Sequence, residues 1–159
     1  MRVVVVLDRI GAPLGAAEAG QAITTGWHAA APGAEVTLVT AALPAPDSPD
    51  GRLGAALDGA GLAIICTAEF DWQSLRSSVV TAVADAAVER GVPCVVIAER
   101  VSVGRREASA IGVDAAYAVI DGSTTAARPS ADPPTHVGQA GDAAVLSALA
   151  ERVARRWSR

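Results

Sequence analysis

The chain contains no lysine: all 13 of its basic residues are arginines, and 17 acidic residues give a formal net charge of −4. A Walker A phosphate loop needs a lysine side chain, and a lysine Schiff base needs the amine, so both kinds of chemistry are excluded for this chain. Aromatic residues make up only 3% of the sequence. The mild acidity and the scarcity of stacking side chains argue against a nucleic-acid-binding protein.

Long apolar runs are also absent. No run approaches the ~20 residues of a membrane-spanning helix, and the opening MRVVVVLD is too short for the apolar part of a secretory signal. We therefore expect a cytoplasmic protein without membrane contact. The two cysteines, Cys66 and Cys94, and the two histidines, His28 and His136, lack the spacing of a structural zinc site. The cysteines are interpreted as free core thiols and His28 as a surface residue at a helix end.

The 159 residues fit one domain, and 51% of them are hydrophobic. Short apolar runs alternate with longer helical patterns, which predicts parallel strands joined by helices. The expected fold class is α/β: a three-layer α/β/α sandwich around a five-stranded parallel sheet in the flavodoxin-like order 2-1-3-4-5. We expect strands at Arg2–Leu7, Glu35–Thr40, Gly61–Cys66, Val92–Ala98 and Ala115–Ile120. We expect helices at Leu14–Ala30, Arg52–Asp58, Trp72–Arg90, Gly104–Ile111 and Gly141–Trp157, and a flexible loop at 121–138.

Open parallel sheets bind ligands at the carboxyl ends of their strands. The predicted strand ends carry Asp8, Glu69 with Asp71, and Glu99 with Arg100. We therefore take Asp8, Glu69, Asp71 and Arg100 as ligand-binding candidates. Because hard cations prefer carboxylate oxygens, Asp8 and Asp71 are also candidate metal ligands. The alternatives are that Asp8 accepts hydrogen bonds from the following turn, that Asp71 caps the next helix, and that Arg100 is an exposed residue near a helix start.

Most of the chain resembles the bacterial glycerate kinases, especially their actinobacterial branch. The opening MRVVVVLDRIGAPLGAAEAG resembles the family segment in which a strand leads into P-D-S-F-K-G-[ST]-L-S-A-A-E. Residues 61–157 are similar to the carboxyl-terminal part, above all from DWQSLRSSVV to AAYAVID. The resemblance implies a flavodoxin-like domain that, together with a large inserted domain, phosphorylates D-glycerate with ATP and magnesium. Here residues 43–60 stand in place of the insertion, so residues 1–159 are expected to form the flavodoxin-like domain alone.

The family's functional positions are only partly kept. Asp8 matches the family aspartate, and Asp71 is kept as well. The family lysine falls on Gly11, the glutamate of a T-G-E-G segment falls on Thr67, and a Gly-Lys pair becomes Ser77-Ser78. Phosphoryl transfer depends on neutralising charge on the transferred group. The resemblance therefore implies a glycerate kinase-like pseudoenzyme, a binding or protein-interaction module that needs no cofactor.

A second interpretation keeps a residual site at the same edge of the sheet. In it, Asp8, Glu69 and Asp71 bind a nucleotide or a small hydroxy acid together with magnesium, and the site becomes active only with a partner subunit. As for partners, the predicted Trp72–Arg90 helix is more apolar than one face of a sheet requires. We therefore expect a homo-oligomer or a protein partner, and neither nucleic acid nor a membrane.

Overall fold

The computed structural model describes residues 1–8, 14–41, 51–76, 79–119 and 143–158. Five strands form one parallel sheet in the order β2-β1-β3-β4-β5, which confirms the predicted topology. The strands are β1 (Arg2–Leu7), β2 (Glu35–Thr40), β3 (Leu62–Phe70), β4 (Cys94–Val101) and β5 (Ala115–Ala118). The helices are α1 (Ala16–Ala30), α2 (Gly51–Leu57), α3 (Val79–Glu89), α4 (Arg105–Ala110) and α5 (Ala143–Trp157).

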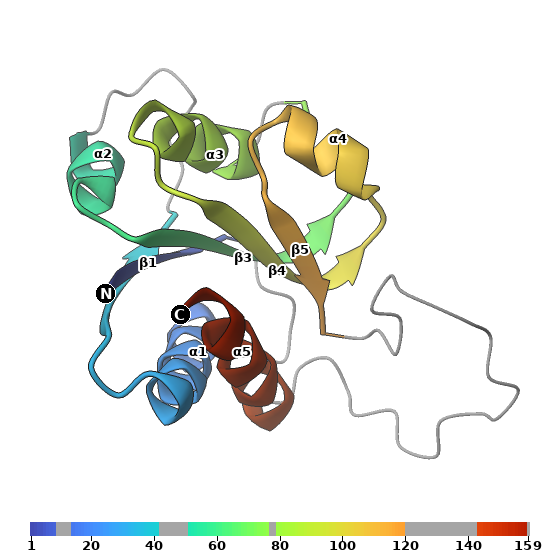
Figure 1. The fold of residues 1–159 in the computed structure, drawn as a ribbon. Coiled ribbons are helices and arrows are strands. Elements are labelled where there is room, and N and C mark those ends of the chain that lie inside the picture. Colours follow the sequence, from blue (N-terminus) through green and yellow to red (C-terminus); the bar gives the residue numbers. More distant parts are fainter. Residues whose placement is uncertain (9–13, 42–50, 77–78, 120–142, 159) are drawn as a thin grey trace, which may run out of the picture.

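The helices form a layer on each side of the sheet. Helices α1 and α5 cover one face, and α2, α3 and α4 cover the other (Figure 1). This arrangement follows from parallel strands, whose crossover connections are right-handed and place helices on the sheet faces. Within the described residues, no helix is long and apolar enough to cross a membrane.

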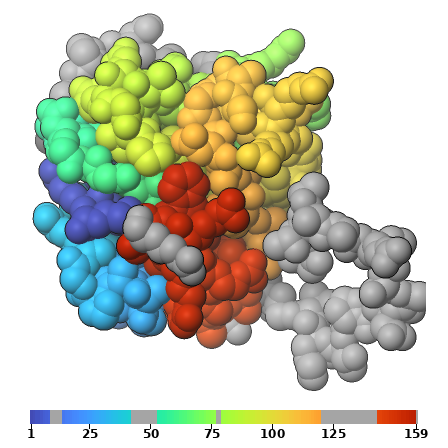
Figure 2. Space-filling view, in the orientation of Figure 1, coloured from blue at the N-terminus to red at the C-terminus, as the bar shows by residue number. Residues whose placement is uncertain are grey.

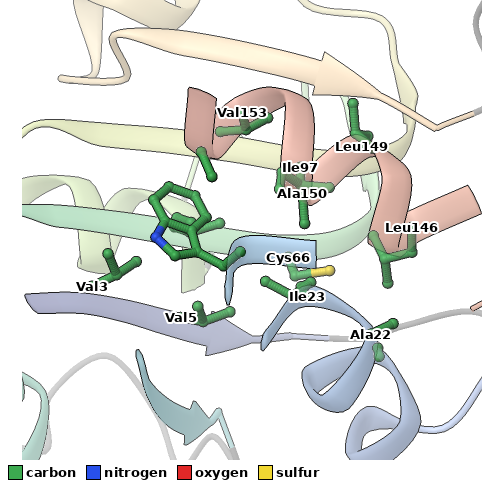
Figure 3. Packing of buried hydrophobic residues seen from close by; sticks show 14 of the residues in the cluster. Val3, Val5, Ala22, Ile23, Cys66, Ile97, Leu146, Leu149, Ala150 and Val153 are labelled. Carbon is green, nitrogen blue, oxygen red and sulfur yellow. The ribbon is translucent and has the colours of Figure 1, made fainter. Parts of the chain in front are cut away.

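The core under α1 and α5 is made of small and branched side chains. Ile23 and Trp27 of α1 are fully buried, and they pack with the fully buried Ala150 of α5 and with Val3 and Val5 of β1 (Figure 3). The valine run of β1 is buried on both faces, as expected for a central strand of a doubly covered sheet. Helix α1 begins after Gly15, whose backbone N–H donates to the Glu18 carboxylate, so the glutamate half of a capping box is present.

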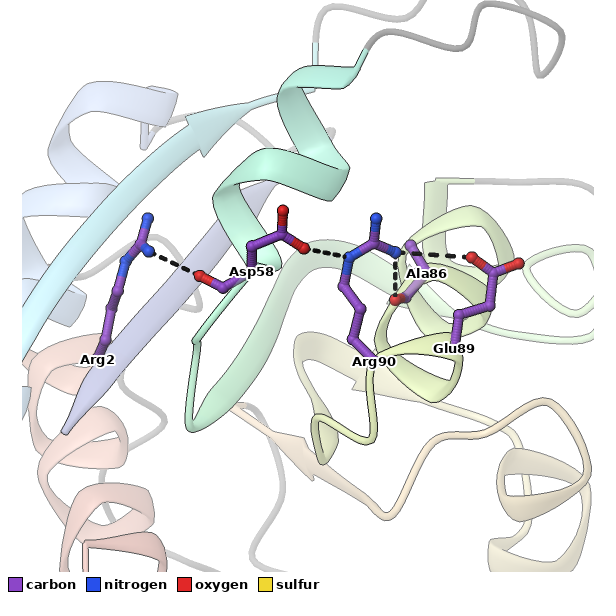
Figure 4. Close-up of polar contacts among 5 residues, drawn as sticks. All are labelled: Arg2, Asp58, Ala86, Glu89 and Arg90. Atoms are coloured by element: carbon purple, nitrogen blue, oxygen red, sulfur yellow. Dashed lines mark hydrogen bonds and ion pairs between the residues drawn. The ribbon is translucent and has the colours of Figure 1, made fainter.

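Helix α2 is fixed by a polar network at the amino edge of the sheet (Figure 4). Arg90 Nε donates to Asp58 Oδ1 at 2.9 Å, and Arg90 Nη1 donates to the Ala86 carbonyl oxygen at 3.0 Å. On the other side, Arg2 Nη1 donates to the Asp58 carbonyl oxygen at 2.9 Å. A Cβ on Gly54 would lie 2.5 Å from Arg90 Nη2, so the glycine lets the guanidinium pass close to α2. The network thus holds α2 where the chain enters β3.

Two strands are longer than the sequence predicts. We expected ends at Cys66 and Ala98, but β3 continues to Phe70 and β4 to Val101. The apolar runs do end near the predicted positions. The strands nevertheless keep pairing beyond them, with Glu69 aligned to Arg100. Consequently β3 and β4 extend past the end of β1, whose last paired residue is opposite Cys66.

The prediction of one long helix from Trp72 to Arg90 is wrong. Turns occupy residues 72–75, Arg76 is in a bend, and α3 is Val79–Glu89 in the described part of the chain. The apolar side chains of α3 are mostly core residues that pack on the second face of the sheet. Ala82 and Val88 are the exposed exceptions, and the larger of the two, Val88, is 59% exposed. The other predicted helix and strand ends differ from the structure by about two residues or fewer, which is common at element termini.

Candidate functional site

Asp8 and Thr67 meet where the sheet reverses its strand order. Asp8 directly follows β1, and its backbone N–H donates to the Cys66 carbonyl oxygen at 2.8 Å. Thr67 lies in the neighbouring strand β3, and its Oγ1 donates to Asp8 Oδ2 at 3.4 Å. In the order 2-1-3-4-5, the chain leaves β1 toward one edge and later builds β3 toward the other. Ligands of open α/β sheets bind at such a switch point, so this pair marks the candidate site.

Thr67 is a residue that strand periodicity did not single out. Among the described residues it is the only buried polar side chain, with 6% of its surface exposed. Alternation along β3 places it on the same sheet face as Ala63 and Ile65, which pack under α2 and α3. The site therefore combines one half-buried carboxylate, from Asp8, with one buried hydroxyl on this face. The signal in the sequence was the alignment of Thr67 with a family glutamate.

Glu69 and Arg100 form an ion pair on the part of β3 and β4 that extends past β1. Arg100 Nη1 donates to Glu69 Oε1 at 3.0 Å, and both side chains are exposed. The two predicted ligand residues are thus brought together by strand register rather than by a bound group. An exposed pair of this kind contributes roughly 0–1 kcal/mol to stability. The pair also neutralises the charge of Glu69 within this rim.

Asp71 organises a turn rather than the start of α3. Its Oδ1 accepts hydrogen bonds from the backbone N–H groups of Gln73 and Ser74 and from the Ser74 hydroxyl, each at 3.0 Å. Bonds from the backbone and then the hydroxyl of Ser74, together with that from Gln73, lower the pKa of Asp71. The alternative that Asp71 caps the next helix is wrong, because α3 is Val79–Glu89 and the hydrogen bonds of Asp71 close this turn. The adjacent Trp72 is 60% exposed.

Neither cysteine is suited to nucleophilic chemistry. Burial, followed by the carboxylates of Glu99 and Asp8, raises the pKa of Cys66 to about 12. Burial and then Asp114 raise the pKa of Cys94 to about 12. A thiol reacts as its thiolate, so both groups are inert near neutral pH. The interpretation of both as free core thiols is confirmed.

His28 is an exposed residue near the end of α1, as the sequence predicts. Its Nε2 lies 3.0 Å from the carbonyl oxygen of Ala34, and this contact ties the helix end to the turn before β2. His136 lies outside the described residues. His28 thus contacts the backbone of Ala34 and lies far from Asp8.

The sequence model of the glycerate kinase family matches residues 50–155. The chain belongs to the glycerate kinase family. The matched region runs from the segment before α2 into α5 and includes Thr67, Glu69, Asp71 and Arg100, whereas Asp8 precedes it. A search of curated proteins finds no match.

The positions at which the family resemblance implies lysines decide whether this chain can keep the family's chemistry. The positions aligned with family lysines, Gly11 and Ser77-Ser78, lie outside the described residues, as do 42–50 and the predicted loop at 121–138. None of these positions is a lysine, because the full sequence contains none. The position aligned with the family glutamate lies within β3, whereas we expected it after the strand.

The described residues fit a magnesium ion only in part. No three His, Cys, Asp or Glu side chains in this part of the chain gather so that they could hold a metal ion. Asp71 already uses Oδ1 in its turn. Asp8 remains the carboxylate at the switch point, and magnesium in nucleotide sites often takes one or two carboxylates plus phosphate oxygens. Asp8 would then be the protein ligand, and magnesium would supply charge neutralisation for a bound phosphate.

Proposed function

We propose that this glycerate kinase-family domain is a non-catalytic binding or protein-interaction module. The observation that carries the proposal is the pairing at the switch point: beside Asp8 lies the hydroxyl of Thr67, where the family resemblance implies a glutamate. The absence of lysine from the whole chain points the same way. Among the described residues, Arg100 at the end of the neighbouring strand β4 is paired with Glu69.

The energetic argument rests on how phosphoryl transfer is catalysed. Positioning and charge neutralisation supply nearly all of the rate acceleration. Removing one preorganised stabilising contact from a transition state typically costs about 3 kcal/mol, or ~100-fold in rate. Two lysines and one carboxylate are missing, and the loss of each contact would lower the turnover rate by a factor of this size. The chain alone is therefore expected to lack useful kinase activity.

A direct assay tests this proposal. The purified chain is incubated with ATP, magnesium and D-glycerate, and ADP release is measured against a sample without D-glycerate. We expect no release that depends on D-glycerate. Turnover that requires D-glycerate, disappears in Asp8→Asn and survives in the remote control Asp85→Asn would overturn the proposal.

We further infer that the chain is a short family member of the actinobacterial type, in which residues 43–60 replace the inserted domain. In support, β2 ends at Thr40, and α2 leads directly into β3 at Leu62. The Arg90–Asp58 contact fixes α2 at this point.

A flavodoxin-like domain that lacks the inserted domain of the family is expected to bind another copy of itself or another protein. Sedimentation velocity over a range of concentrations tests self-association, and a monomer at all of them would leave only a different protein as partner.

The position of Asp8 favours a second candidate function. It is half-buried at the switch point, and its side-chain hydrogen bond with Thr67 is long, at 3.4 Å. A nucleotide or small hydroxy acid, bound with magnesium, could engage this carboxylate, with a partner subunit supplying the missing cations. Calorimetric titration with ATP and with D-glycerate, each with and without magnesium, tests it. Binding tighter than about 1 mM (about 4 kcal/mol) that is lost in Asp8→Asn supports this function, and no heat in any combination rejects it.

A further inference from the structure

A pocket of about 410 Å³ lies at the opposite edge of the sheet from Asp8. It opens between the carboxyl ends of α3 and α4, beside the amino ends of β4 and β5. Figure 2 shows the lime-green surface of α3 meeting the orange surface of α4 on this side of the molecule. The volume falls within the range of roughly 300–1,000 Å³ that is typical of small-ligand sites. Nothing in the proposed function of the Asp8 site involves this pocket.

The pocket has apolar walls. Val88 and Pro93 contribute side chains, and Gly91 and Gly112 contribute backbone. Both glycines have positive φ, 63° and 82°, because each ends a helix in a left-handed turn. No heavy atom would lie within 4 Å of a Cβ on Gly91, so the space beside it is open. A Cβ on Gly112 would lie 2.5 Å from Val88 Cγ2, which shows that Val88 lies directly over Gly112.

The rim of the pocket is electronegative. Asp114 lies at the rim, and its Oδ2 accepts a hydrogen bond from the Cys94 backbone N–H at 2.8 Å, which orients the carboxylate. The carboxyl ends of helices carry partial negative charge, and α3 ends beside the pocket. Glu89 is exposed at that end. The nearby cation, Arg90, forms an ion pair with this Glu89, with its Nη1 3.6 Å from Glu89 Oε2, and also donates to Asp58 and Ala86 (Figure 4). The negative charge of the rim therefore rests on Asp114 and the end of α3.

We propose that this pocket binds a small aliphatic cation, an alkylguanidinium or alkylammonium compound. The alkyl chain packs against Val88 and Pro93, and the cationic head forms a charge-assisted hydrogen bond with Asp114. The apolar walls alone would accept a neutral alcohol. The carboxylate and the helix end add a preference for positive charge, which distinguishes this site from a simple apolar depression.

The test is a titration of the ¹⁵N-labelled chain with n-butylguanidinium, followed by amide chemical shifts. We expect saturable shifts at Gly91, Ser109, Gly112 and Asp114, and none around Asp8. Butanol should give weaker binding at the same amides, and butyrate should give none. Equal binding of all three compounds, or no saturable shifts with n-butylguanidinium, would overturn the proposal.

Two variants separate charge from shape. Asp114→Asn keeps an acceptor for the Cys94 N–H but removes the charge, and should weaken n-butylguanidinium binding by about tenfold. Asp85→Asn removes the same charge from an exposed position on α3 outside the pocket lining, and should leave binding unchanged. Val88→Ala should weaken n-butylguanidinium and butanol alike, and the fold should tolerate it because Val88 is exposed. Equal effects of the two aspartate variants would contradict a specific role for Asp114.

Discussion

Gly26 of α1 lies directly against the backbone of Ser147 in α5. A Cβ added to Gly26 would overlap the Ser147 carbonyl oxygen and would lie 3.1 Å from the Ala150 Cβ. The two helices therefore approach this closely only because position 26 has no side chain. Since α1 and α5 together cover one face of the sheet, this contact sets the geometry of a whole layer (Figure 1).

Replacing Gly26 by alanine should lower the free energy of unfolding by about 1–3 kcal/mol or more, because backbone atoms must move to relieve the overlap. Gly20 in the same helix is the matched control. A Cβ there would lie 2.8 Å from Leu38 Cδ1 and 3.1 Å from Leu7 Cδ1, so it would meet the ends of two side chains and no backbone atom. Leu38 is 44% exposed and Leu7 is buried. Gly20→Ala should therefore cost clearly less than Gly26→Ala, because the higher helix propensity of alanine, worth up to about 1 kcal/mol, offsets part of the crowding. Urea denaturation measures both, and equal effects would refute the Gly26 contact.

Thr67→Val keeps the shape of the buried side chain and removes the hydroxyl that contacts Asp8. We expect a loss of about 0.5–1.5 kcal/mol in the free energy of unfolding, which is the usual net value of one hydrogen bond. The change should be much smaller in an Asp8→Ala background, because the acceptor is already gone. A double-mutant cycle from denaturation curves measures the coupling. Strictly additive effects would show that the two side chains do not interact.

The turn after β3 should be sensitive to acid. Because the folded-state pKa of Asp71 is lowered, its stabilising effect is present above its ordinary pKa of about 3.9 and is lost as the pH falls through the folded value. The exposed Trp72 next to it reports the change through its fluorescence. We expect an acid transition below about pH 3.9 that is absent in Asp71→Ala and in Trp72→Phe. The same transition in Asp71→Ala would assign it to another group.

Neither thiol should react with Ellman's reagent at pH 8 in the native protein, and both should react fully in urea. Their pKa values of about 12 mean that unfolded thiols, with pKa about 8.5, lose protons first. The contribution of the two protonated thiols to the free energy of unfolding is therefore fully present below about pH 8.5. It falls as the pH rises toward 12. Cys66→Ser and Cys94→Ser assign the two reactions. A rapid reaction of either thiol in the native state would contradict its burial.

The strand order could be predicted because each buried strand is a short apolar run separated by a helical pattern. The ends of β3 and β4 could not, since polar residues such as Glu69 and Arg100 interrupt each apolar run before its last paired residue, Phe70 or Val101. The start of α3 was missed for a related reason. An aspartate before an apolar periodic segment caps a helix or a turn with the same hydrogen bonds, and the sequence of Asp71 and Ser74 does not distinguish them.

For the candidate site, strand ends alone identified Asp8, because a carboxylate directly follows the valine run of β1. They did not identify Thr67, because the strand was predicted to end at Cys66 and Thr67 lies within β3, one residue beyond that end. The pairing of Glu69 with Arg100 depends on register across two strands. Contacts between distant segments of the chain therefore account for most of what the sequence could not predict.

The packing of α1 on α5 has a consequence for synthesis of the chain. Helix α1 emerges early from the ribosome, whereas its partner α5 is translated after every other described helix and strand. Until then the side of α1 that carries Ile23 and Trp27 lacks its cover. Incomplete chains should consequently recruit chaperones or be degraded, and the native state becomes accessible only when translation has passed Trp157.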